Sequence, residues 1–230
     1  MMKTSFVFPA KCILCGDVIS GGKLICHDCS EDGLLIRGKI CRYCGIERSR
    51  CACEKHRRYF ERRIACVYYE KGARRGIARL KFYRHTMLAR YYGQMMAVNV
   101  CSKYDGISFD YIVPVPMHPW DKIRRGYNCA QLLAAQISKD TGVPMLTDGL
   151  YKRRHTKPQK RMNGAQRTAN VLDAFSTKRA DLLQDKTILL VDDVVTTGAT
   201  LNECAKILRL AGARKVYAAS FAAVPQKRVE

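Results

Sequence analysis

The sequence lacks long apolar runs and low-complexity tracts. None of its 230 residues belongs to a stretch of the roughly 18 consecutive apolar residues that a membrane-spanning helix needs. The apolar segment at residues 6–10 is too short for the core of a secretory signal peptide, and a cysteine cluster follows it directly. Because 47% of the residues are hydrophobic, the chain can still build a full globular core. We therefore expect a cytoplasmic protein with no membrane span.

Acidic residues are also scarce: 20 Asp and Glu oppose 41 Lys and Arg, which gives a formal net charge of +21. The excess of basic residues concentrates in two stretches, at residues 62–84 and 152–179. This charge exceeds what one small anionic ligand requires, so a surface for a polyanion such as single-stranded DNA is one interpretation. A solvated basic face is the other. Six aromatic residues in or near the first stretch can stack on bases if they are exposed, but core positions are favoured for them: Tyr68, Tyr69, Phe82, Tyr83, Tyr91 and Tyr92.

Twelve cysteines in a chain without an export signal indicate metal binding more than disulfides. Eight of them lie within the first 53 residues as four close pairs, which predicts two structural zinc sites of four thiolates each. The simplest assignment places Cys12, Cys15, Cys26 and Cys29 in one site and Cys41, Cys44, Cys51 and Cys53 in the other. Crossed pairing, or His56 in place of one member of the last pair, stays open. Four thiolates leave no coordination position for a catalytic water.

The remaining cysteines, Cys66, Cys101, Cys129 and Cys204, have no paired spacing, and we expect them in the core. The cysteine-rich segment is too small to build much apolar core, so metal binding should supply its folding free energy. We therefore expect a double zinc ribbon at residues 1–58 and a second domain at 59–230.

The most informative segment runs from Ile188 to Thr200 and reads ILLVDDVVTTGAT. Its first four residues suit a strand buried on both faces of a parallel sheet. The paired acids Asp192 and Asp193 then lie near the end of the sheet where open α/β folds bind ligands. The next residues offer hydroxyl groups, a glycine and free backbone N–H groups at a helix start, as a phosphate cradle needs: Thr196, Thr197, Gly198, Ala199 and Thr200. An ordinary strand–loop–helix crossover is the less favoured alternative.

A second polar segment follows another predicted strand, at residues 111–115. It contains Pro116, Met117 and His118 and then the adjacent cations Arg124 and Arg125. Because the carboxyl ends of parallel strands meet at one edge of a sheet, these arginines are candidates to bind the same ligand. Exposure of either arginine to solvent is the alternative. Helices predicted at residues 73–82, 88–99 and 128–141 and strands at 64–69 and 215–222 complete an alternating α/β pattern.

The segment ILLVDDVVTTGAT resembles the phosphoribosyl diphosphate (PRPP) motif of type I phosphoribosyltransferases. Together with residues 111–118, the sequence RRGYN at 124–128 and Gln131, it makes the chain similar to the ComF family, named for bacterial competence for DNA uptake. The resemblance covers residues 12–221 and implies a type I phosphoribosyltransferase fold, a parallel sheet flanked by helices, behind a small double zinc ribbon. It further implies that Asp192 and Asp193 bind the ribose hydroxyls, that residues 196–200 hold the 5-phosphate, and that Mg²⁺ accompanies PRPP.

The resemblance also implies a flexible loop that closes over the diphosphate, for which the polar segment at residues 151–164 is the candidate. Four residues in or after it match the ComF pattern: Gln159, Arg161, Arg167 and Asn170. Three functions remain compatible with the sequence. They are transfer of the phosphoribosyl group to an unknown acceptor, sensing of PRPP without turnover, and binding of single-stranded DNA or a partner protein during DNA uptake.

Overall fold

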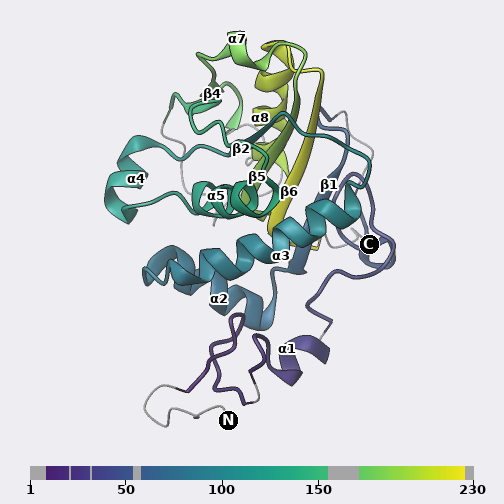
Figure 1. The fold of residues 1–230 in the computed structure, drawn as a ribbon, viewed down its shortest axis with the longest axis vertical. Helices are drawn as coiled ribbons and strands as arrows, with labels where there is room; N and C mark the ends of the chain where they lie inside the picture. Colours follow the sequence, from purple (N-terminus) through teal and green to yellow (C-terminus); the bar gives the residue numbers. More distant parts are fainter. Residues whose placement is uncertain (1–8, 21, 32, 54–57, 155–170, 226–230) are drawn as a thin grey trace.

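The computed structural model describes residues 9–20, 22–31, 33–53, 58–154 and 171–225. Within these ranges the main sheet has four parallel strands in the order β1-β6-β5-β2. They are β1 (Arg63–Tyr68), β2 (Tyr111–Pro114), β5 (Thr187–Val195) and β6 (Lys215–Ala223). The predicted α/β class with a parallel sheet is therefore confirmed. The strands cross the centre of the molecule with helices on both sides (Figure 1).

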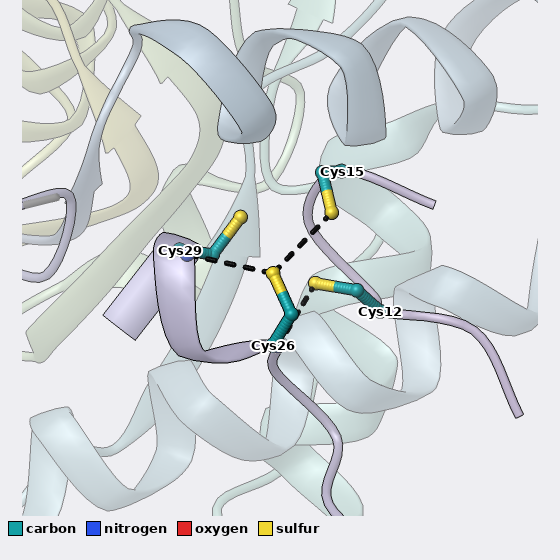
Figure 2. Close-up of side chains that lie close together, drawn as sticks. All are labelled: Cys12, Cys15, Cys26 and Cys29. Carbon is teal, nitrogen blue, oxygen red and sulfur yellow. Dashed lines mark hydrogen bonds between the residues drawn. The ribbon is translucent and has the colours of Figure 1, made fainter. Parts of the chain in front are cut away.

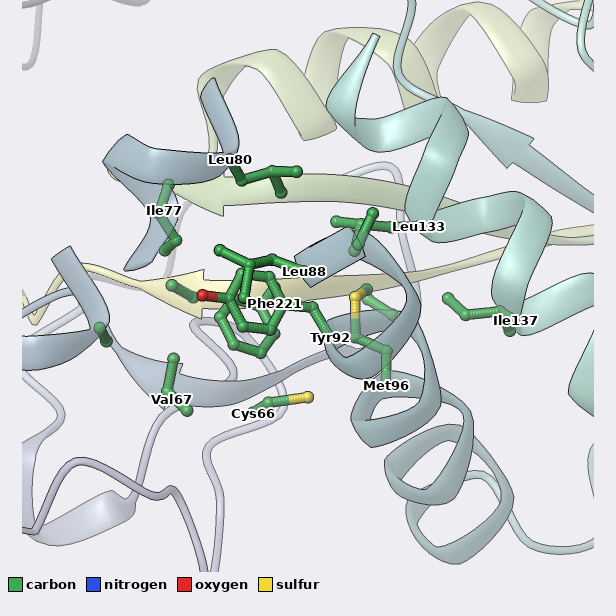
Figure 3. Close-up of a cluster of buried hydrophobic side chains, with 14 of the residues drawn as sticks. Cys66, Val67, Ile77, Leu80, Leu88, Tyr92, Met96, Leu133, Ile137 and Phe221 are labelled. Atoms are coloured by element: carbon green, nitrogen blue, oxygen red, sulfur yellow. The ribbon is translucent and has the colours of Figure 1, made fainter. Parts of the chain in front are cut away.

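Three helices cover one face of this sheet: α2 (Lys71–Phe82), α3 (Met87–Lys103) and α5 (Cys129–Thr141). Their apolar side chains pack with alternate residues of the strands, such as Leu189 of β5 and Phe221 of β6. Tyr92 of α3 stacks on Phe221 with ring centroids 3.9 Å apart (Figure 3). Such stacked aromatic pairs stabilise a core beyond their buried area. This face therefore holds the larger hydrophobic core of the molecule.

Helix α8 (Ala199–Leu210) covers the opposite face. Its residues Leu201, Cys204, Ala205 and Leu208 are all fully buried, as their helical spacing predicts. The short helix α7 (Ala180–Leu183) and the antiparallel pair β3 (Tyr151–Lys152) and β4 (Phe175–Ser176) lie on the same side. The start of α8 is thus held firmly against the sheet, which fixes the loop before it.

The cysteine-rich segment contains only two short helical elements within its described residues, α1 (His27–Glu31) and η1 (Arg48–Arg50). Its first part lies beneath α2 and α3 and shares their core, while its second part packs against β1 (Figure 1). Residues 34–36 run antiparallel to β1, because Tyr68 N donates to Leu34 O at 2.8 Å and Ile36 N donates to Cys66 O at 2.9 Å. This segment covers the edge strand, whose backbone groups would otherwise be unpaired.

Three local expectations need correction. The polar segment after Val115, for which the sequence indicated no helix, contains the helix α4 (Pro119–Arg125). Cys101 is exposed on α3, although Cys66, Cys129 and Cys204 are buried as expected. Of the six aromatic residues in or near the first basic stretch, Tyr68 and Tyr92 are core, whereas Phe82 and Tyr83 are exposed. Among the helices of the described residues, none has the length and apolar character that crossing a membrane requires.

Candidate functional site

The two adjacent acids lie where β5 loses one of its neighbours. On the β2 side, pairing ends at Pro114 with Val191, one residue before Asp192. On the β6 side, pairing continues to Val195 with Ala223, so β5 is longer than the sequence predicts and carries both acids within it. The carboxylates therefore face a crevice at the C-terminal end of the sheet, where open α/β sheets place their ligands.

The loop that follows β5 has the backbone of an anion cradle. Gly198 adopts φ +85°, a left-handed conformation that favours glycine, and it is the N-cap of α8. Ala199 N donates to Thr197 Oγ1 at 3.3 Å, which holds the threonine side chain across the turn. The first N–H groups of α8 have no partner within the helix, and the helix dipole adds positive potential there. Residues 196–200 line a small hollow of about 20 Å³ together with Asp192.

Helix α4 brings the two predicted arginines toward the crevice. His118 Nδ1 accepts from Trp120 N at 3.4 Å and so caps the N-terminus of α4, which gives this histidine a structural role. Arg124 is largely exposed and lies 3.4 Å from Asp121, while the Arg125 guanidinium lies 5.6 Å from the ring centre of Phe82. Both arginines nevertheless line the same pocket as the acids.

Lys81 is a site residue that the sequence did not single out. It comes from the last turn of α2, and its Nζ lies 2.7 Å from Asp193 Oδ1. Both side chains are mostly buried, with 21% and 13% of their surfaces exposed, so the ion pair is shielded from solvent. Nothing in the sequence marks Lys81 among its basic neighbours, because only the tertiary packing of α2 points it at β5.

The electrostatics of the acid pair follow from burial. Burial and the neighbouring Asp193 carboxylate raise the pKa of Asp192 to about 7, and the positive charges of Lys81 and Arg63 only partly oppose this rise. Burial alone would lower the pKa of Lys81, but the Asp193 and Asp192 carboxylates outweigh it and leave the pKa above its ordinary value. Near neutral pH the site thus holds a charged lysine and an acid poised between its two protonation states.

One pocket of about 710 Å³ collects these groups. Its lining includes the carboxylates of Asp192 and Asp193 and the hydroxyl-bearing Thr200. It also includes cations from three different elements: Lys81, Arg124, Arg125 and Lys152. The volume suits a small ligand, and the mixture of carboxylates with several cations suits one that carries both hydroxyl and phosphate groups. Thr196, Thr197, Gly198 and Ala199 line the adjoining hollow, which shares Asp192, Val194 and Thr200 with the pocket. Residues 155–170, including Gln159, Arg161, Arg167 and Asn170, lie outside the described residues.

The eight cysteines of the first 53 residues form two clusters with the predicted membership. Cluster 1 contains Cys12, Cys15, Cys26 and Cys29, and cluster 2 contains Cys41, Cys44, Cys51 and Cys53. In cluster 1 the four side chains point toward one another from two segments, one with Cys12 and Cys15 and the other with Cys26 and Cys29 (Figure 2). The Sγ atoms of Cys15 and Cys26 lie 3.6 Å apart. In cluster 2, the Sγ atoms of Cys41 and Cys53 lie 3.7 Å apart. His56 lies outside the described residues.

The sulfur geometry fits structural zinc. Four thiolates around a tetrahedral zinc ion at about 2.3 Å lie about 3.8 Å from one another. The Sγ separations of 3.4–3.7 Å in the two clusters approach this value, and all candidate ligand atoms of each cluster lie within 4.8 Å of one another. Backbone N–H groups also point at the sulfurs, as Asp17 N does at Cys15 Sγ at 3.4 Å, and such donors stabilise thiolates.

The sequence thus predicted the acids, the loop and the cysteine clusters, all of which are local in the chain. It missed Lys81, which reaches the site from 112 positions upstream of Asp193. It also gave no role to Arg63, a buried residue of β1 that contacts the loop at Gly198. An arginine at the start of an apolar strand is a weak sequence signal for a buried cation with a specific contact, because arginine is rarely buried.

Comparison with known proteins agrees with this architecture. The phosphoribosyl transferase domain matches residues 101–230, and the double zinc ribbon domain matches residues 4–64. Competence protein F of Haemophilus influenzae is 28% identical over 219 residues, which cover 91% of this chain and 95% of that protein. DNA utilization protein YhgH of Escherichia coli K12 is 28% identical over 218 residues, which cover 90% and 94%.

Among solved structures, glutamine PRPP amidotransferase from B. subtilis, complexed with ADP and GMP, is similar with a TM-score of 0.39 and 22% identity. That similarity covers 57% of this chain and 25% of the amidotransferase. The domain match from residue 101 to residue 230 spans more than half of the chain. The chain therefore belongs to the phosphoribosyl transferase domain family, as a ComF-like member with an N-terminal double zinc ribbon.

Proposed function

We propose that the chain binds PRPP with Mg²⁺ at the C-terminal end of β5 and transfers the phosphoribosyl group to an acceptor, with release of diphosphate. The observation that carries this proposal is the single pocket that joins Asp192 and Asp193 to Thr200 and to cations of α2 and α4. PRPP has matching parts, since its ribose hydroxyls donate to carboxylates and its phosphates accept from cations and backbone N–H groups.

Each part of PRPP has a partner in this assignment. The loop at residues 196–200 and the start of α8 hold the 5-phosphate. Asp192 and Asp193 accept hydrogen bonds from the ribose hydroxyls. Lys81, Arg124 and Arg125 face the diphosphate from the other side of the pocket. This division places the anomeric carbon between the carboxylates and the cations.

The charges that develop in the reaction suit these residues. Breaking the bond from the anomeric carbon to diphosphate makes the ribosyl group more positive and the leaving group more negative. Asp192 and Asp193 lend negative potential to the ribosyl side, and the cations of α2 and α4 stabilise the diphosphate. The carboxylate oxygens suit Mg²⁺, which would supply Lewis-acid neutralisation of the diphosphate when bound.

The test is calorimetric titration of PRPP with Mg²⁺ into the zinc-loaded full-length chain. We expect binding, and we expect its loss in Asp192→Asn/Asp193→Asn but not in Asp105→Asn, which neutralises an exposed acid outside the pocket lining. No heat with the folded wild-type protein would contradict the proposal. Diphosphate release is then measured across nucleobases, amines and oligonucleotides. Binding without release for any acceptor would instead favour a PRPP sensor.

A second candidate function is binding of single-stranded DNA. A separate pocket of about 520 Å³ lies between the second cysteine cluster and the C-terminal end of α3. Its charged lining residues are all basic: Arg37, Lys39, Arg48, Arg62 and Lys103. Such a pocket suits the phosphate groups of a polyanion. The names of the two curated relatives, a competence protein and a DNA utilization protein, support a role for this chain with DNA.

This candidate predicts salt-dependent binding of a labelled single-stranded oligonucleotide, measured by fluorescence anisotropy. Lys39→Gln/Arg48→Gln should weaken binding and make the slope of log affinity against log salt shallower by about 1.4. The control Lys122→Gln/Lys139→Gln removes the same charge from exposed positions outside both pockets. Equal effects of the two double variants would show that net charge, and not this pocket, binds the oligonucleotide.

A further inference from the structure

Arg63 is a buried arginine whose contacts lie at the second cysteine cluster. It is the first residue of β1, and only 2% of its surface is exposed. Its Nε donates to the Cys44 carbonyl oxygen at 2.9 Å, and its Nη2 donates to the same oxygen. Cys44 belongs to cluster 2, so this cluster determines where the guanidinium lies. Completely buried arginines are rare because removing the charge from water is costly.

The opposite end of the same guanidinium lies against the loop after β5. A Cβ atom added to Gly198 would lie 2.7 Å from Arg63 Nη1, so this nitrogen is packed directly against the loop backbone. Gly198 thus has two reasons to be glycine, its φ of +85° and the guanidinium beside it. Nη1 is fully buried and has no hydrogen-bond partner among the described residues.

The guanidinium of Arg63 brings a positive charge to the loop at residues 196–200, which contains no basic residue. An arginine guanidinium stays ionised at neutral pH even in a buried position. Arg58 Nη1 would lie 3.7 Å from the same added Cβ. Two guanidinium groups therefore approach the loop at Gly198, and an anion held by the loop would offset their repulsion.

We propose that Arg63 is a positioning residue for the phosphate loop, held by the Cys44 carbonyl, so that cluster 2 sets the affinity of this loop for a phosphate group. The guanidinium braces the backbone at Gly198 and adds positive potential behind the N–H groups that face the phosphate. This inference rests on the proposed function only in assigning the phosphate to the loop. It gives the double zinc ribbon a direct physical connection to the ligand site.

The test compares Arg63→Gln and Arg63→Lys with the wild-type full-length chain. Calorimetry measures the Kd for PRPP and for ribose 5-phosphate with Mg²⁺, and metal analysis checks that each variant keeps its zinc. We expect Arg63→Gln to bind both ligands at least tenfold more weakly, because the charge and the brace are lost. Arg63→Lys restores the charge without the two-donor contact to Cys44, so its loss should be about threefold.

Arg79 is the matched control. Its Nη2 donates to the carbonyl oxygens of Cys12 at 3.2 Å and Ile13 at 3.0 Å, so it supports cluster 1 as Arg63 supports cluster 2. The pocket and the hollow at the loop do not include it. Arg79→Gln should therefore bind ribose 5-phosphate within twofold of the wild type. An equal loss in Arg79→Gln and Arg63→Gln would overturn the proposal, since it would reflect general weakening of the ribbon.

Two further outcomes would refute the proposed role of Arg63 in phosphate binding. A folded, zinc-loaded Arg63→Gln that binds ribose 5-phosphate within twofold of the wild type refutes the role of Arg63. If Arg63→Gln does not fold, wild-type affinity in Arg63→Lys for both ligands refutes it equally. A wild-type protein that binds ribose 5-phosphate but not PRPP would reject the proposed function, while the comparison of the arginine variants would remain valid.

Discussion

At the scale of single residues, the site is a small network of charges around Asp192 and Asp193. Lys81 neutralises Asp193 directly, and Asp193 N donates to Asp192 Oδ1 at 2.8 Å. Burial and the second carboxylate then keep a proton on Asp192 more tightly than on an ordinary aspartate. A ligand that brings hydroxyl donors and a divalent cation would favour the ionised form of Asp192, so binding and proton release should be coupled.

The raised pKa of Asp192 predicts how stability depends on pH in the ligand-free protein. Its pKa is about 7 in the folded chain, against about 3.9 in an unfolded one. Folding therefore favours the protonated form of Asp192. The contribution of this group to the free energy of unfolding is fully present below about pH 4 and is lost as the pH rises to about 7. Asp192→Asn keeps the acceptor for Asp193 N and removes this loss. Its melting temperature should exceed that of the wild type by several degrees more at pH 8 than at pH 5.

Differential scanning fluorimetry of the two proteins across this pH range measures the effect. Asp105→Asn, at an exposed position, is the control for the loss of one carboxylate. A constant difference between Asp192→Asn and the wild type from pH 5 to pH 8 would show that Asp192 has no raised pKa.

Lys81→Met tests the cation of α2. Without Lys81 the repulsion between the two carboxylates is less compensated, and the pKa of Asp192 rises further because one of its two positive neighbours is gone. We expect PRPP affinity at pH 7 to fall about tenfold, since a charge-assisted contact to the diphosphate is also lost. Calorimetry at pH 7 and pH 8.5 should show partial recovery at the higher pH. Lys122→Met, an exposed lysine of α4, is the control and should bind like the wild type.

At the scale of elements, the sequence RRGYN at residues 124–128 mainly joins helices around the site. Gly126 ends α4 with φ +89°, and the hydroxyl group of Tyr127 donates to the Leu80 carbonyl at the end of α2. Asn128 begins α5, because its Oδ1 accepts from Ala130 N at 3.0 Å. These contacts hold α2, and with it Lys81, against the end of the sheet. A motif whose two arginines line the ligand pocket thus also has an architectural role.

Asn128→Ala tests this architecture. Asn128 is buried, and its Nδ2 also donates to Val115 O at 2.9 Å, which ties the end of β2 to the start of α5. The substitution removes a helix cap and leaves a buried carbonyl without its partner, so we expect a loss of about 2 kcal/mol in the free energy of unfolding. Urea denaturation measures this loss. Asn128→Ser should retain the cap and lose about half as much, and equal losses in both variants would argue against a capping role.

At the scale of the whole molecule, the two cysteine clusters lie on different sides of the sheet. Cluster 1 belongs to the core beneath α2 and α3, where Tyr92 donates to Ile13 O at 2.7 Å. Cluster 2 packs against Ala65 and Tyr68 of β1. The division of the chain at residue 58 remains a prediction, because cluster 1 shares its core with helices that follow this boundary. The ribbon is therefore part of the support of the site and more than an appended module.

Loss of metal should consequently weaken the whole fold. The cysteine-rich segment has little core of its own, so zinc supplies much of its folding free energy. Cys12→Ser/Cys15→Ser should lose about one equivalent of zinc and lower the melting temperature by more than 5 °C, roughly the effect of 1.5–2.5 kcal/mol in a chain of this size. Cys101→Ser, at an exposed cysteine outside both clusters, should change neither value. An unchanged melting temperature after complete zinc removal would contradict this structural role.

Much of the site could be predicted because its residues are close together in the chain. The acid pair, the hydroxyl-rich loop and the cysteine pairs are short patterns whose chemistry depends on spacing alone, and the structure places each pattern as a unit. The element types followed from hydrophobic periodicity, as Leu201 and Leu208 of α8 illustrate. The helix α4 was missed because a helix of seven residues, with Trp120 and Ile123 as its only large apolar side chains, is too short to show a clear hydrophobic period.

The sequence by itself determined the strand, the acids, the loop and the four cysteine pairs, since these depend on neighbouring residues, whereas the structure decided which pairs come together. Only the tertiary structure decided that Lys81 pairs with Asp193 and that Arg63 lies between Cys44 and Gly198. Basic residues are abundant in this chain, and composition gives no means of choosing among them. Burial distinguishes the basic residues of the site from the others, because a cation removed from water must lie next to the groups that stabilise its charge.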